Sequence, residues 1–382
     1  MKWLKTIEPY RLLFPIGTMF GALGVYVWIA NAFIPHFEYP GQLHSKLMLG
    51  TFLFSFAAGF LMTAIPKMTA SFAAQPYEMV IAFVLVLTNA LCAYLARPEL
   101  FYLMSATSIF GLIVFFGRRF RARTKSPPPF FPFVLLGLLS GLSGAIIMST
   151  NGFMQTPPEL FLFAKKIYFE GMILFLVLGI GSRLIPVISG RGITNEKNGR
   201  WVVLRNVFLG LILVLAFAFE GFGFTLTGGV LKSLIVSWVA FFGWGLLTKS
   251  QTKSRLAFGM RISGLMVLGG IYMSVLQPSF AVHWMHLTYI AGFGLMTLTV
   301  ATRVTLAHGS YDLTFEKQSS ALWICGALIL TAAATRVAAP FIGSSYFMHL
   351  AYAAMVWIAA IGVWGIVFVK RMIWKGEGQA SC

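Results

Sequence analysis

The chain has 382 residues, of which 58% are hydrophobic and only 10% are charged, and its formal net charge is +18. Soluble domains have about 25% charged residues, and apolar runs of 18 or more residues recur here, so the composition excludes an ordinary soluble protein. The excess of positive charge indicates the basic cytoplasmic loops of a membrane protein and not a nucleic-acid-binding surface.

Twelve apolar segments follow one another along the chain, each near the ~20 residues that cross about 30 Å of hydrocarbon. We therefore predict an all-α fold, a polytopic transmembrane helical bundle of about 12 spans that forms a single integral-membrane domain over residues 1–382. The third and fourth segments are separated only by Arg97-Pro98-Glu99. The predicted spans are residues 12–34, 46–66, 78–97, 100–117, 131–150, 164–188, 202–221, 226–248, 257–278, 282–306, 319–341 and 346–369.

Positively charged residues gather in the fourth, sixth and eighth loops and at both ends of the chain. Cytoplasmic loops carry such an excess, so both termini are predicted to be cytoplasmic. Lys165 and Lys166 in the fifth loop are exceptions to the pattern. The residues that carry the pattern are Lys2, Lys5, Arg118, Arg119, Arg121, Arg123, Lys125, Arg191, Lys197, Arg200, Lys249, Lys253, Arg255, Lys370, Arg371 and Lys375.

The histidines follow the predicted topology closely. Five of the six lie at the outer level of the membrane, and only His308, just past the tenth span, lies at the inner level. Glu170, Glu220 and Lys232 lie at the same outer level, and His283 and His286 share one helical face because they are three residues apart. The five outer histidines are His36, His44, His283, His286 and His349.

Clustered histidines in membrane helices ligate a metal or haem, or relay protons. A haem iron takes axial imidazoles from two facing helices, and His44 with either His283 or His286 would supply such a pair. The remaining histidines, among them His349, are candidates for a second metal such as copper, with a methionine as a further ligand. The alternative for each is an amphipathic residue at the interface, and we favour that interpretation for His36.

Three arginines within the spans also need partners, because an unpaired charge in the membrane is costly. Arg183, Arg303 and Arg336 are predicted to pair with a carboxylate, a haem propionate or helix C-terminal carbonyls. Snorkelling into the headgroup region is the alternative for Arg183 and Arg303, which lie near the cytoplasmic ends of their spans. The sequence has neither GxxxxGK[ST] nor CxxCH, which argues against an ATP-driven transporter and against covalently attached haem.

Four stretches carry a resemblance to a known family. They are residues 58–69 (AGFLMTAIPKMT), 181–186 (GSRLIP), 286–308 (ending RVTLAH) and 335–340 (TRVAAP). Together, in this order and spacing, they resemble the NnrS family of bacterial membrane proteins. The resemblance implies a twelve-helix inner-membrane protein with haem b and copper, tied to nitric oxide metabolism and to tolerance of nitrosative stress.

The resemblance implies functional roles for two groups of residues in this chain, histidines and arginines. The chain departs from the family before the second span, where the family tends to have H-x-H-E-M: here Lys46 replaces the second histidine and Leu47 the glutamate. If that histidine were a ligand, this chain would bind one metal fewer. The matching candidates are His44, His286, Arg183, Arg303, His308 and Arg336.

Three functions remain open from the sequence. The first is a haem protein that acts on nitric oxide or its metal adducts as a small-molecule ligand, and an oxidoreductase activity is left open for it. The second is a permease for copper or another small substrate, surrounded by membrane lipid. The third is an electron-transfer subunit with a quinone or other electron donor as partner. On one helix, His283 and His286 are separated from Arg303 and His308 by about 25–37 Å at about 1.5 Å per residue, so the two pairs belong to different sites.

Overall fold

The computed structural model describes residues 7–95, 97–191 and 199–374. Among these residues, twelve helices are long and apolar enough to cross a membrane, which confirms the predicted all-α fold and the number of spans. Lys2, Lys5, Lys197 and Lys375, which contribute to the predicted orientation, lie outside the described residues.

The first six spans run from Tyr10 to Ile188. The second and sixth are each a continuous rod of three consecutive helical segments. The spans are α1 (Tyr10–Phe33); α2 (Gly41–Leu47), η2 (Met48–Leu53) and α3 (Phe54–Thr69); α4 (Pro76–Tyr94); α5 (Pro98–Arg121); α6 (Phe131–Thr150); and α7 (Pro158–Lys166), η3 (Ile167–Gly171) and α8 (Met172–Ile188).

The last six spans run from Gly199 to Ile373, and a short helix, α14 (Phe315–Gln318), precedes the eleventh. The spans are α9 (Gly199–Gly221); α10 (Thr225–Trp238) with η4 (Val239–Gly243); α11 (Arg255–Leu276); η5 (Pro278–Phe280), α12 (Ala281–His286), η6 (Leu287–Gly294) and α13 (Leu295–His308); α15 (Ser320–Ala338) with η7 (Ala339–Phe341); and η8 (Gly343–Ser345) with α16 (Tyr346–Ile373).

The close boundary between the third and fourth spans follows from proline chemistry. Pro76 and Pro98 are the first residues of α4 and α5, where the missing N–H is not needed and the fixed φ suits a helix start. Glu78 also accepts a hydrogen bond from the backbone N–H of Gln75, at 2.8 Å, and so closes the first turn of α4. The two segments therefore form separate helices with a very short connection.

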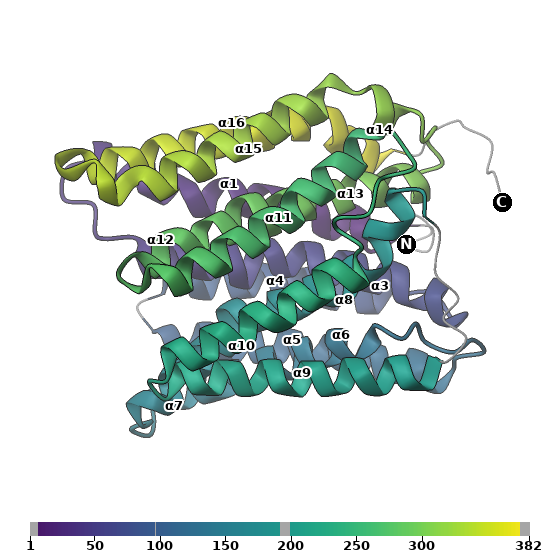
Figure 1. Ribbon diagram of the computed structural model, residues 1–382, viewed down its shortest axis with the longest axis horizontal. Coiled ribbons are helices and arrows are strands. Elements are labelled where there is room, and N and C mark those ends of the chain that lie inside the picture. The colour runs from purple at the N-terminus through teal and green to yellow at the C-terminus, as the bar shows by residue number, and fades with distance from the viewer. Residues whose placement is uncertain (1–6, 96, 192–198, 375–382) are drawn as a thin grey trace.

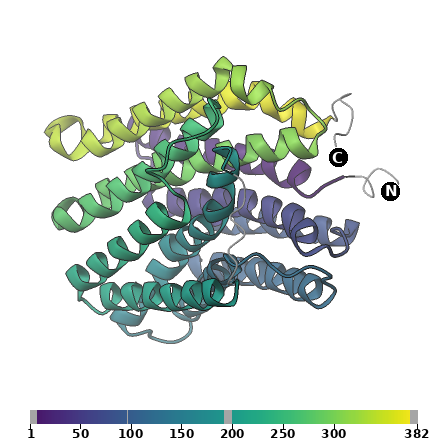
Figure 2. The same ribbon diagram turned by 45° about the vertical axis from the view of Figure 1, so that its right-hand side comes forward.

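The helices lie side by side along the long axis of the molecule (Figures 1 and 2). The last helix, α16, packs against α1 and α15, while α9 packs against α10 at the opposite edge. The first and last helices meet where α1 begins, because Arg11 Nη1 donates a hydrogen bond of 2.7 Å to the carbonyl of Met372. We call this end of the bundle the terminal end, and the end where α1 finishes and α2 begins the distal end.

The second, tenth and sixth spans form the centre of the bundle. Their most apolar windows are 89%, 78% and 61% buried, whereas the corresponding values for the other spans lie between 28% and 56%. Each of the three contains a π-helical segment, respectively η2, η6 and η3. Such segments are rare and occur frequently at functional sites.

Candidate functional site

A cavity of about 640 Å³ lies near the distal end, among the three central spans, and is also lined by residues of α1, α15 and α16. This volume falls within the roughly 300–1,000 Å³ of typical small-molecule sites. Most of its wall is apolar, but two histidines, His44 and His286, line it together with Arg336, Glu99 and Lys165. The cavity therefore combines an apolar body with a few polar groups that can orient a ligand.

The π-helical segments supply a large part of the cavity wall. Met48, Leu49, Phe52 and Leu53 come from η2, and Phe169 comes from η3. The segment η6 contributes two further side chains. A π-helical turn inserts one residue into the helix and so rotates the side chains that follow it. The lining residues from η6 are Tyr289 and Ile290.

His44 and His286 face each other across part of this cavity. Their ring centroids are 6.5 Å apart and their planes differ by only 11°. His44 Nδ1 lies 2.7 Å from the carbonyl oxygen of Gly24, and His286 Nδ1 lies 2.7 Å from that of Val282. Each ring is thereby oriented by one backbone contact.

These contacts define which nitrogen of each ring is available to a ligand. A carbonyl oxygen only accepts hydrogen bonds, so Nδ1 must carry the proton and donate it. In the neutral imidazole, Nε2 then has the lone pair, which is the form that ligates a metal. The two rings are held in the tautomer that a pair of axial ligands requires.

The distance between the ring centroids nearly equals the length that two imidazoles bound to one metal ion would span. Metal–imidazole bonds of about 2.0–2.1 Å, with about 1.1 Å from each nitrogen to its ring centre, separate two opposed rings by about 6.3 Å. The observed 6.5 Å agrees with this value. Haem iron is commonly held by axial histidines, so His44 and His286 fit the ligand set of a haem.

Close packing of α1 on the second span positions His44. A Cβ added at Gly24 would lie 2.8 Å from Met48 Sδ and 3.1 Å from Leu47 Cβ. Only glycine lets the two helices approach this closely, and the same residue supplies the carbonyl that His44 contacts. Trp28 completes the setting, with its ring edge-on to His44 at 5.7 Å.

Arg336 links the cavity to His283. The arginine is 7% exposed, lines the cavity, and its Nη1 donates a hydrogen bond of 2.7 Å to His283 Nδ1. Because His283 Nδ1 accepts this hydrogen bond, it carries no proton and the imidazole is neutral. The arginine therefore occupies the lone pair of Nδ1. Arg336 and Lys165 place positive charge on the cavity wall, where carboxylates of a bound molecule would find partners.

The structure brings some predicted residues to this cavity and places others elsewhere. His349 is on α16 but is not among the described residues that line the cavity; its ring lies edge-on to Tyr352 at 5.7 Å. Arg303 Nη1 forms an ion pair of 2.8 Å with Glu316 Oε2. Arg183 lines a small, otherwise apolar cavity between α3 and α8. His36 follows α1 in an exposed turn.

His308 belongs to a separate polar cluster at the terminal end. Its Nδ1 lies 3.1 Å from Glu8 Oε2 and 2.7 Å from Lys67 Nζ, and Lys67 pairs with Glu8 Oε1 at 2.9 Å. Burial acts to raise the pKa of Glu8, but the hydrogen bonds and charges of His308 and Lys67 outweigh it and hold that pKa below its ordinary value. The cluster ties the start of the chain to α3 and α13.

The positions of the described His, Cys, Asp and Glu side chains do not form a separate copper site. In the described part of the chain, no three His, Cys, Asp or Glu side chains lie together in a way that could hold a metal ion. The remaining outer histidines are dispersed, because His283 contacts Arg336 while His349 and His36 lie apart from it. A copper site made of three such side chains is therefore not found among the described residues.

Lys46, which stands where the resembled family has a second histidine, points away from the candidate haem site. Its ammonium lies 5.6 Å from the centre of the Phe101 ring and the residue is 5% exposed. Residues 44 and 46 lie on different faces of a helix because they are two apart. In contrast Met48, four residues after His44, lines the cavity.

A buried ion cluster lies on the sixth, seventh and eighth spans, near the same end. Lys232 Nζ contacts Glu170 Oε1 at 2.6 Å and Glu220 Oε1 at 2.8 Å, and Lys166 Nζ contacts Glu220 Oε2 at 2.7 Å. The predicted outer-level groups Glu170, Glu220 and Lys232 thus meet. Lys166, an exception to the charge pattern of the loops, is paired with a buried carboxylate and so has a structural reason for its position.

Some functional candidates have no recognisable signal in the sequence. Glu99, Lys165 and Tyr289 line the cavity, as does Trp357, whose Nε1 donates a hydrogen bond of 3.0 Å to the Gly21 carbonyl. They lie on four different spans, and only the packing of those spans brings them together. A membrane-embedded lysine or glutamate is the one type among them that the sequence alone could have singled out.

Comparison with protein-family models gives a match over most of the chain. The family model described as NnrS protein matches residues 6–375, which is nearly the whole chain. A search of curated proteins finds no match.

Proposed function

This chain belongs to the NnrS family, and on that premise we propose that it is a haem-binding protein of the bacterial inner membrane that acts on nitric oxide. Its role would be in nitric oxide metabolism or in tolerance of nitrosative stress. What is established is a multi-pass membrane protein of this family with 12 candidate spans. The cofactor, the ligand and the membrane in which it resides are the proposal.

The observation that carries the proposal is the pair of histidines on the second and tenth spans. His44 and His286 line one cavity, with nearly parallel rings 6.5 Å apart and each Nδ1 bound to a backbone carbonyl. In this arrangement, His44 and His286 would hold the group through their Nε2 atoms. Haem, when bound, would supply an iron centre that carries an electron, and it would take a diatomic ligand only where one of the two imidazoles gives up its place.

The remaining residues of the cavity would orient the cofactor. Arg336 and Lys165 are positioned to pair with the two propionates, since guanidinium and ammonium groups form charge-assisted hydrogen bonds to carboxylates. Trp28, Phe52 and Trp357 provide an apolar surface for the macrocycle and limit the access of water. Nitric oxide is small and uncharged, so an apolar cavity inside the membrane suits it.

The visible spectrum of the purified protein tests the proposal. We expect a Soret band with one haem per chain, and loss of that band in His44→Ala and His286→Ala. His349→Ala is the matched control, because this histidine lies on a neighbouring span outside the cavity wall. Purified protein without a Soret band, or full haem occupancy in both cavity variants, would overturn the assignment.

The proposed function requires a quinone or a protein electron donor as partner. Uptake assays distinguish the proposed haem protein from the alternative, a permease. Vesicles containing the haem-loaded protein should take up no copper. Copper uptake by protein that lacks haem would favour the permease and contradict our proposal.

A further inference from the structure

Two further cavities lie deeper in the bundle and share lining residues with one another or with the histidine cavity. A mid-bundle cavity of about 60 Å³ lies between α1, α3, α8 and α13, and a third of about 10 Å³ lies beyond it near Arg183. Leu53 lines both the histidine cavity and the mid-bundle cavity. Phe60 and Ile180 line both the mid-bundle cavity and the third. The three cavities therefore form a row along α3 and α8.

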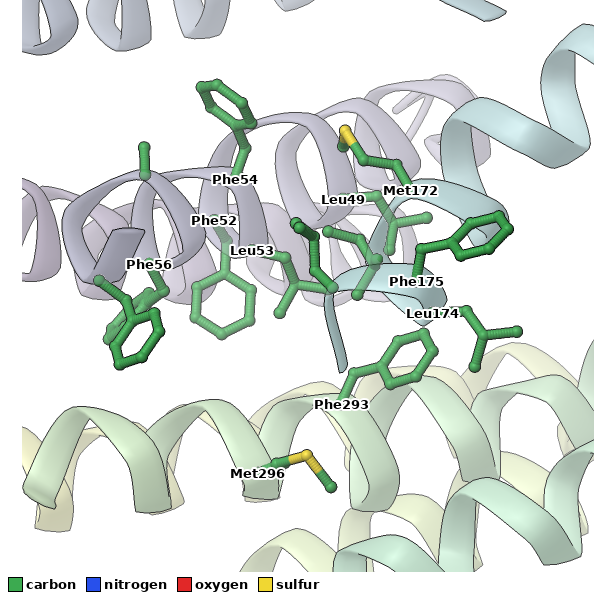
Figure 3. Close-up of a cluster of buried hydrophobic side chains, with 14 of the residues drawn as sticks. Leu49, Phe52, Leu53, Phe54, Phe56, Met172, Leu174, Phe175, Phe293 and Met296 are labelled. Atoms are coloured by element: carbon green, nitrogen blue, oxygen red, sulfur yellow. The ribbon is translucent and has the colours of Figure 1, made fainter. Parts of the chain in front are cut away.

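The row leads away from the distal end toward the middle of the bundle. Leu53 and Phe60 are seven residues apart on one helical rod, which corresponds to about 10 Å at about 1.5 Å per residue. In Figure 3, Leu53 and Phe56 project from this rod toward the helix that carries Met296. Phe56 and Met296 line the mid-bundle cavity with Leu53, and all three are at least 95% buried.

The walls of the mid-bundle cavity identify the chemical class of its occupant. They consist of aliphatic, aromatic and methionine side chains, with Thr297 as the single polar residue type among the described lining residues. A buried water needs two to four polar partners, and apolar cavities of this kind stay dry and bind xenon. Its volume exceeds the roughly 10–15 Å³ that one water-sized particle occupies on the same measure.

We propose that the mid-bundle cavity is a binding site for a small uncharged gas, and that it communicates with the histidine cavity past the side chain of Leu53. This inference rests on the proposed function for the identity of the gas, nitric oxide, but the site itself follows from the cavity and its walls. A diatomic gas partitions into hydrocarbon. A dry site beside the histidine pair would therefore hold it where water and ions do not enter.

The first experiment examines the site without any cofactor. Crystals of the detergent-solubilised protein are exposed to xenon under pressure, and the anomalous signal is located. We expect xenon between Leu53 and Phe60 in the wild type and in Ala57→Ser, which keeps the size of this wall residue. We expect its loss in Ala57→Leu and in Val300→Phe, which fill the cavity from opposite walls. A wild type without xenon there, or xenon that persists in both filled variants, overturns the site.

The second experiment tests communication between the cavities. The haem-loaded protein is mixed rapidly with nitric oxide and the change in the Soret band is followed. The change should be slower in Ala57→Leu and Val300→Phe than in Ala57→Ser, and equal rates in all three would overturn the route past Leu53. A wild-type Soret band that nitric oxide leaves unchanged would instead overturn the proposed function, and the xenon result distinguishes the two failures.

Discussion

Replacing Lys232 with methionine removes the cation that two buried carboxylates share. Lys232 contacts Glu170 at 2.6 Å and Glu220 at 2.8 Å, and its side chain is 3% exposed. Glu220 keeps a second partner in Lys166, at 2.7 Å. The variant Lys232→Met therefore strands mainly the charge of Glu170, whose side chain is 7% exposed.

The expected loss of folding stability equals the free energy of the least costly way to remove the unpaired charge of Glu170. Each contact is worth about 6 kcal/mol in Coulomb energy at an effective dielectric constant of about 20, so an unpaired buried carboxylate takes up a proton. At pH 7 this costs about 3.7 kcal/mol for a glutamate with an ordinary pKa of about 4.3. The expected loss of about 3–4 kcal/mol agrees with measured losses of about 3–5 kcal/mol for broken buried pairs.

The same argument predicts how the loss depends on pH. At pH 5 the protonation cost falls to about 1 kcal/mol, so the deficit of the variant should shrink as the pH decreases. The measurement is unfolding by sodium dodecyl sulfate in mixed micelles, followed by tryptophan fluorescence at both pH values. The double variant Lys232→Met/Glu170→Gln should recover most of the loss, because no uncompensated carboxylate remains at position 170.

Lys253→Met is the control, since this lysine is exposed, does not line the histidine cavity, and has no ion pair among the described residues. We expect a change within about 0.5 kcal/mol, as for most surface substitutions. A Lys232→Met protein that unfolds at the wild-type midpoint, or that shows the same deficit at pH 7 and pH 5, would refute the reasoning.

Two further predictions concern the histidine cavity and the terminal end. Gly24→Ala should cost about 1–3 kcal/mol of stability by overpacking against Met48, and it should also reduce haem retention. Gly326→Ala is the control, because an added Cβ there meets nothing within 4 Å, and it should change neither property. Equal effects of the two variants on the melting temperature and the Soret band would contradict the prediction. The lowered pKa of Glu8 means that its stabilising contribution is present above its ordinary pKa of about 4.5. This contribution is lost as the pH falls below that value, so wild type and Glu8→Gln should differ in melting temperature at pH 6 and converge at pH 3, and a constant difference would exclude the ionised form as the cause.

The spans illustrate what local sequence can predict. Apolar length predicted twelve spans, including the third and fourth, which the sequence separates only by Arg97-Pro98-Glu99. A membrane helix satisfies its own backbone hydrogen bonds and needs only a sufficient apolar length. The level of each polar residue along its span is equally local, since it depends on counting residues from the loops. The cytoplasmic placement of both termini remains a prediction.

The histidines show where this kind of inference ends. His44, His283, His286 and His349 are predicted at one level, but only His44 and His286 line the same cavity. Level is a matter of distance along a helix, whereas contact also depends on how each helix is rotated. Lys46 is an example, because a shift of two residues from His44 directs it to Phe101 and away from the cavity.

By itself, the sequence determined the membrane class, the number of the spans, and the set of polar residues predicted at each level. The tertiary structure decided which of them meet: His44 with His286, Arg336 with His283, and Lys232 with two glutamates. It also decided the π-helical turns that line the cavity. The physical reason is that apolar length is a property of each segment alone. Rotation, helical register and cavities arise from the packing of segments that are far apart in the chain.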